Sequence, residues 1–80
     1  MDPVSIGNRI RALRGAESQQ TLADKLKISK SALAMYERGE RIPRDEVKIR
    51  IAHHFNVSLE SIFLRRVSTN SAESRAVQEN

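Results

Sequence analysis

The sequence lacks cysteine and tryptophan, and only 4% of its residues are aromatic. Without cysteine the chain can form neither a disulfide bond nor a zinc site with thiolate ligands. It also lacks an apolar run long enough for a signal peptide or a membrane-spanning helix. These absences exclude disulfide-stapled scaffolds, and we expect a cytoplasmic protein without a membrane partner.

The polar residues form no pattern typical of an enzyme or a metal site. We find no pair of acids, no nucleophile with a base, and no glycine-rich phosphate loop. His53 and His54 are adjacent, so they point to different faces of a helix, and neither has a second histidine four residues away. We therefore expect no enzymatic activity, no metal, no cofactor and no small-molecule ligand.

Positive charge is concentrated in the first four fifths of the chain. The net charge is +4, and residues 1–66 contain 13 of the 14 Lys and Arg residues but eight of the ten acids. A basic balance indicates a polyanionic partner, although it is weak evidence on its own. After Arg66 the composition shifts to small polar residues. We predict one domain over residues 1–66 and a disordered polar tail over residues 67–80.

Apolar residues recur at helical spacing in five segments, and no alternating strand pattern is present. Each expected helix begins after a residue that caps helices well or ends before a glycine, except the fourth, which is expected over about residues 44–55. The pattern predicts an all-α fold with two short helices joined by a tight turn at its centre. The expected boundary residues are Asp2, Gly15, Ser18, Ser29, Gly39 and Ser58.

The order of these segments resembles the lambda-repressor/Cro-like (Xre-type) family of helix-turn-helix DNA-binding proteins. The matching pieces are IGNRIRALR, QQTLADKLKISKSAL, YERGERIP and IAHHFNVSLESIF, which cover roughly residues 4–64. The resemblance implies a five-helix domain, usually dimeric, whose third helix enters the major groove. Lys27 occupies the turn position where the family often has glycine, so a left-handed backbone there would carry strain.

The third helix, about residues 30–38, is expected to read bases with its outward face. On a helical wheel Leu33 and Tyr36 point inward, and the outward positions coincide with those that the family uses for base contacts. Lys30 can donate to guanine, Ser31 can bond to either partner of a base pair, and Ala34 and Met35 suit a thymine methyl group. The alternative is that alanine is there as a helix former and that methionine contacts protein.

The DNA backbone is expected to lie beside this helix. The resemblance implies a phosphate contact for Gln19 and places the loop after the third helix along the backbone, where Arg44 could reach the minor groove. The alternative for any one surface arginine is that it serves only solubility. The predicted DNA-binding residues are Gln19, Ser29, Lys30, Ser31, Ala34, Met35, Arg38, Arg41 and Arg44.

Two further predictions concern structure and assembly. Glu37 lies in the last turn of its helix, where the helix dipole disfavours an acid, and the resemblance implies a structural ion pair with Arg14. The last helix has more apolar surface than one short helix needs, so we predict that it forms a homodimer contact. The alternative is that its apolar residues only complete the core. These residues are Leu59, Ile62, Phe63 and Leu64.

We therefore predict a sequence-specific, double-stranded-DNA-binding transcriptional regulator, of the repressor type found in phages, mobile elements and bacteria. Its third helix would enter the major groove of an inverted-repeat operator. The alternative is an antitoxin-type or other protein-interaction module that uses the same domain to bind a protein partner. The polar residues after Arg66 offer little for such a partner.

Overall fold

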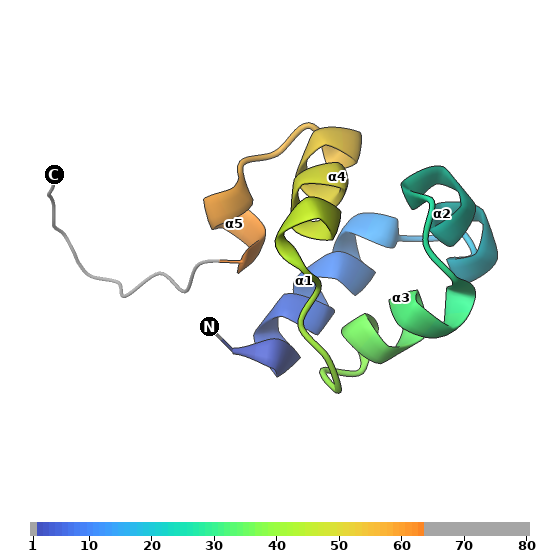
Figure 1. Ribbon diagram of the computed structural model, residues 1–80, viewed down its shortest axis with the longest axis horizontal. Helices are drawn as coiled ribbons and strands as arrows, with labels where there is room; N and C mark the ends of the chain where they lie inside the picture. Colours follow the sequence, from blue (N-terminus) through green and yellow to red (C-terminus); the bar gives the residue numbers. More distant parts are fainter. Residues whose placement is uncertain (1, 64–80) are drawn as a thin grey trace, which may run out of the picture.

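The computed structural model describes residues 2–63, which form five helices and no strand. The helices are α1 (Pro3–Arg14), α2 (Gln19–Leu26), α3 (Lys30–Glu37), α4 (Asp45–Phe55) and α5 (Leu59–Phe63). In Figure 1, α1 runs through the middle of the domain, with α2 and α3 to one side and α4 and α5 to the other. The all-α prediction is confirmed, whereas the predicted tail lies outside the described residues. None of these five helices is long and apolar enough to cross a membrane.

Polar side chains cap the starts of four helices, as the sequence predicts. Each accepts a hydrogen bond of 3.0–3.1 Å from a main-chain N–H in the first turn, which satisfies a group without a partner inside the helix. These residues are Asp2, Ser18, Ser29 and Ser58. The fourth helix begins at Asp45, one residue later than expected, and the side chain of Arg44 makes no capping hydrogen bond.

Helices α2 and α4 end in the same left-handed turn. Lys27 follows α2 with φ of 60°, and Asn56 follows α4 with φ of 56°. In each case the next residue, Ile28 or Val57, donates its N–H back into the helix and packs partly against the core. The backbone at Lys27 is therefore left-handed, which is the case in which the sequence analysis expects strain, and it orients the start of α3 relative to α2.

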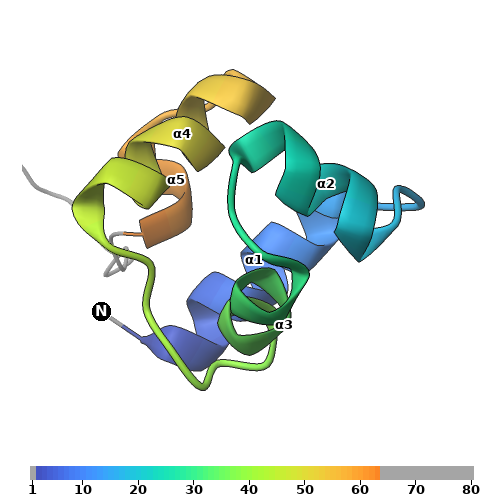
Figure 2. The same cartoon turned by 45° about the vertical axis from the view of Figure 1, so that its right-hand side comes forward.

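The hydrophobic core lies between α1 and the other four helices. All five helices contribute to it, so the two central helices are held at a fixed angle by the rest of the domain (Figure 2). Lys48 closes one edge, where its ammonium group lies 5.8 Å from the centre of the Phe63 ring. The buried members of this hydrophobic cluster are Ile6, Ile10, Leu22, Ala23, Leu26, Leu33, Tyr36, Val47, Ile51, Ile62 and Phe63.

The predicted dimer contact needs correction at two positions. Ile62 and Phe63 are 1% and 2% exposed, so they belong to the core of a single chain and cannot contact a second copy in this fold. Leu59 is 41% exposed and remains accessible, whereas Leu64 lies outside the described residues. Two of the three apolar side chains in the described part of α5 are therefore buried in the core of the single chain.

Helices α1 and α3 cross at Gly7, a residue that the sequence analysis did not single out. A β-carbon at this position would lie 2.5 Å from the main-chain oxygens of both Tyr36 and Glu37. Only hydrogen fits there, so Gly7 lets the backbones of the two helices approach closely. This contact sets the distance between α3 and α1 where they cross.

Candidate nucleic-acid interface

One long face of α3 is open to solvent. Leu33 is fully buried and Tyr36 is 7% exposed, so they anchor the inner face of the helix. On the other side Lys30 and Ser31 are exposed at the start of the helix, and Arg38 is exposed at its end. Figures 1 and 2 show α3 at the edge of the domain, where no other helix covers this side. The structure thus brings the predicted reading residues of α3 onto one accessible surface.

The centre of this surface is apolar. Ala34 and Met35 are half-buried, so each keeps part of its side chain accessible between the polar residues at the two ends of α3. Ser29 is exposed as well, but its hydroxyl already accepts the N–H of Ala32 at 3.0 Å. The same hydroxyl can still donate its own proton. The face therefore offers donors around an apolar middle, as a base-reading surface requires.

Glu37 links α3 to the two helices that precede it. Its side chain is buried, and its carboxylate accepts hydrogen bonds from Arg14 Nε at 2.7 Å and Arg14 Nη2 at 2.9 Å. Burial raises the pKa of the Glu37 carboxyl, but hydrogen bonds from Arg14 and Gln19 and the positive charges of Arg14 and Arg11 together hold that pKa below its usual range. The contact expected between Arg14 and Glu37 is therefore present, and it is more deeply buried than a surface ion pair.

Gln19 takes part in the same cluster, which the sequence analysis missed. Its side-chain nitrogen Nε2 donates to Glu37 Oε1 at 3.0 Å. This hydrogen bond joins the first residue of α2 to the last turn of α3. One amide proton of Gln19 is thus directed into the protein, toward Glu37. No local sequence signal marks this contact, because the two residues are 18 positions apart.

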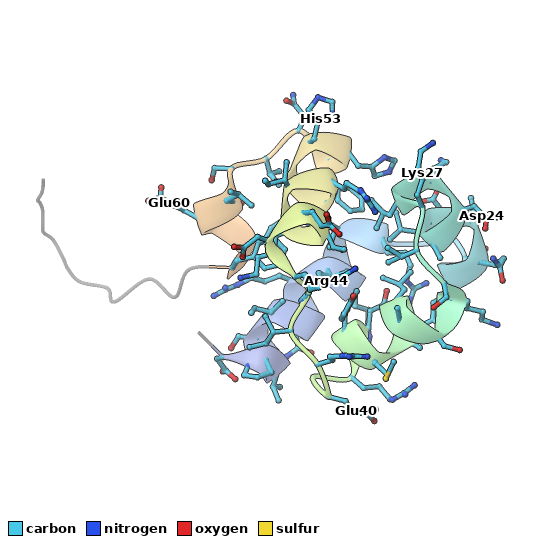
Figure 3. The ribbon with its side chains drawn as sticks, in the orientation of Figure 1. Asp24, Lys27, Glu40, Arg44, His53 and Glu60 are labelled. Carbon is cyan, nitrogen blue, oxygen red and sulfur yellow. The ribbon has the colours of Figure 1, made fainter. Side chains whose placement is uncertain are left out.

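The loop between α3 and α4 carries the two remaining predicted residues. Pro43 is buried and fixes the loop against the domain, while Arg41 and Arg44 are exposed. Figure 3 shows Arg44 at the start of α4, where its guanidinium lies 3.3 Å from the Glu46 carboxylate. Arg41 and Arg44 line one open hollow between α3, this loop and α4. They therefore lie beside the exposed face of α3 rather than on it.

Candidate metal ligands do not cluster in the part of the chain that the structure describes. No three His, Asp or Glu side chains of residues 2–63 lie close enough together to share a metal ion. His53 is exposed near the end of α4, which Figure 3 shows at the edge of the domain opposite to Glu40. The exposed face of α3, with the loop that follows it, is thus the surface on which the predicted functional residues gather.

Comparison with known proteins agrees with this geometry. The sequence matches the helix-turn-helix family HTH_3 over residues 10–62, which is more than half of the chain. The match begins within α1 and includes α2, α3, α4 and most of α5. No curated protein and no solved structure shows significant similarity to the chain. The chain therefore belongs to HTH_3, the lambda-repressor-like (Xre-type) family of helix-turn-helix DNA-binding domains.

Proposed function

We propose that the protein is a sequence-specific transcriptional regulator of the repressor type, which places α3 in the major groove of an inverted-repeat operator. The observation that carries the proposal is the accessible face of α3, held clear of the core by the buried Leu33 and Tyr36. B-form DNA admits a helix in its major groove, where every base pair shows a distinct pattern of donors, acceptors and methyl groups.

Base reading falls to the N-terminal half of α3. In helix-turn-helix proteins the first residues of the recognition helix contact base edges. Lys30 donates to the O6 and N7 acceptors of guanine, and Ser31 can donate or accept. Ala34 and Met35 contact thymine methyl groups, because their accessible surface is apolar. These four side chains supply the sequence preference.

Phosphate contacts set the register of the protein on the duplex. The start of α2 presents main-chain N–H groups and the second amide proton of Gln19 to one strand. Arg41 and Arg44 follow the other strand from the loop after α3. Such contacts carry no direct base information, but they position α3 and account for much of the affinity.

Two copies of the domain would read the two halves of the operator. A single domain of this size reads one half-site, and half-sites about one helical turn apart match a two-fold symmetric dimer. Leu59 is the predicted dimer residue that stays accessible among the described residues, so it would contribute to the contact. Sedimentation of the protein with an operator duplex distinguishes two bound copies from one.

Replacing Lys30 with alanine tests base reading. We expect a loss of roughly 1–3 kcal/mol on the preferred duplex and a relaxed base choice at one position, because a donor to a base edge is removed. Binding to a library of duplexes measures both effects. Lys25→Ala is the control, since Lys25 lies on α2 and pairs with Glu17 at 2.6 Å. An equal loss on every sequence would show that Lys30 meets only phosphate.

Replacing Arg41 with alanine tests the backbone contact. We expect weaker binding to all sequences and a salt dependence whose slope falls by about one, because one fewer phosphate counterion is released. Titrations at several salt concentrations measure the slope, and Lys25→Ala again controls for the loss of one positive charge. An unchanged slope would remove Arg41 from the interface.

The same binding measurements on the unaltered protein test the alternative function. Weak binding without base preference would favour a protein-interaction module instead.

A further inference from the structure

The end of α3 is fixed by a tight turn around Gly39. This glycine has φ of +77°, and the N–H of Glu40 donates back to the carbonyl of Met35 at 3.0 Å. A β-carbon on Gly39 would lie 3.0 Å from the Cα of Val4, so the start of α1 packs directly on the turn. The backbone positions of Arg38 and Glu40 are therefore held together at one end of the helix.

Arg38 and Glu40 form a two-pronged ion pair across this turn. Arg38 Nε donates to Glu40 Oε2 at 2.7 Å, and Arg38 Nη2 donates to Glu40 Oε1 at 3.1 Å. Both side chains are about half exposed, at 52% and 53%. The hydrogen bond from Arg38 lowers the pKa of the Glu40 carboxyl, because it favours the ionised form. The fork uses one whole edge of the guanidinium group.

This pair brings a negative charge to the surface that is proposed to approach DNA. Arg38 lies one helical turn after Ala34 on the accessible face of α3, and Figure 3 shows Glu40 at the outer edge of the domain beyond the end of that helix. Because base edges are read by the N-terminal residues of a recognition helix, the C-terminal Arg38 lies toward the sugar-phosphate backbone. The acceptor in its reach is then a phosphate.

We propose that Glu40 restrains Arg38 in this fork and so lowers the affinity of the protein for the phosphates of duplex DNA, whatever the base sequence. Arg38 binds a phosphate only by leaving the carboxylate, which is then left near a negatively charged strand. Glu40 is in this sense a positioning residue that acts through Arg38. The inference rests on the proposed DNA-binding function of the same surface.

Glu40→Gln tests this role, because it removes the charge but keeps the size of the side chain. At about 50 mM salt we expect about three- to fivefold tighter binding to the preferred duplex and to an unrelated duplex alike, with the base preference unchanged. Glu60→Gln makes the same charge change on α5 and should alter the affinity less than about 1.5-fold. Thermal melting checks that both variants remain folded.

A double-mutant cycle with Arg38→Ala shows whether Glu40 acts through Arg38. In the Arg38→Ala background, Glu40→Gln should tighten binding clearly less than it does when Arg38 is present. Equal tightening in both backgrounds, or no tightening in either, would overturn the inference. A changed base preference at one position would also overturn it, because Arg38 would then contact a base. Absence of DNA binding by the unaltered protein would instead refute the proposed function.

Discussion

Replacing Gly7 with alanine is expected to destabilise the domain by about 3 kcal/mol. The new β-carbon would lie 2.5 Å from the main-chain oxygens of Tyr36 and Glu37, and a backbone oxygen cannot rotate away as the end of a side chain can. Helices α1 and α3 must therefore move apart, which loosens the packing of the core side chains that both helices contribute. The gain of about 1 kcal/mol in helix propensity from glycine to alanine offsets only part of this cost.

Urea unfolding followed by circular dichroism measures the effect. Asn8→Ala is the matched control, because Asn8 is the next residue of α1 and is exposed, so its replacement should change the free energy of unfolding by less than about 0.5 kcal/mol. We also expect weaker DNA binding by Gly7→Ala, since α3 would be displaced from its position on α1. A Gly7→Ala variant as stable as the unaltered protein would contradict the close crossing of these helices.

Replacing Arg14 with methionine is expected to cost about 3 kcal/mol of stability. The side chains of Arg14 and Glu37 are 18% and 1% exposed, so the substitution leaves a buried carboxylate with Gln19 and the more distant Arg11 as its remaining partners. The double variant Arg14→Met/Glu37→Met should be more stable than Arg14→Met alone, because it leaves no buried charge uncompensated. Denaturant unfolding of the unaltered protein, Arg14→Met, Glu37→Met and the double variant measures the coupling, and additive losses would contradict it.

The same pair predicts how stability depends on pH. The pKa of Glu37 is lowered by folding, so the unfolded chain takes up a proton at a higher pH than the folded protein does. The stabilisation is therefore fully present above the ordinary glutamate pKa of about 4.3 and is lost as the pH falls through the lower pKa of the folded state. Melting temperatures of the unaltered protein and Glu37→Gln, measured from neutral pH downward, should converge in this acidic range. A constant difference would contradict the assignment.

The helices and their caps could be predicted because their signals are local. Ser18 and Ser29 each precede an apolar repeat of helical period. The turn at Lys27 lies between these two repeats, so its place follows from theirs. The outward face of α3 also follows from periodicity alone, since burying Leu33 and Tyr36 leaves only one side for Lys30 and Ser31. The candidate site could thus be outlined from the sequence alone.

Contacts between distant segments could not be predicted in the same way. Gly7 looks like an ordinary weak point within a helix until Tyr36 and Glu37 are seen against it. Helix α5 is too short for its apolar residues to show a helical repeat, so the sequence did not separate an inner face from an outer one. Ile62 and Phe63 were therefore wrongly predicted to contact a second copy. These errors reflect tertiary packing, which a single helical repeat does not encode.

The most direct test of the central claim is a map of the amides that respond to DNA. Nuclear magnetic resonance spectra of the labelled protein, recorded during titration with its preferred duplex, report the chemical shift of each residue. The largest changes should fall on residues 29–35 and continue along the loop to Arg44. Largest changes around His53 at the end of α4, on the opposite edge of the domain in Figure 3, would contradict the claim that α3 meets the DNA.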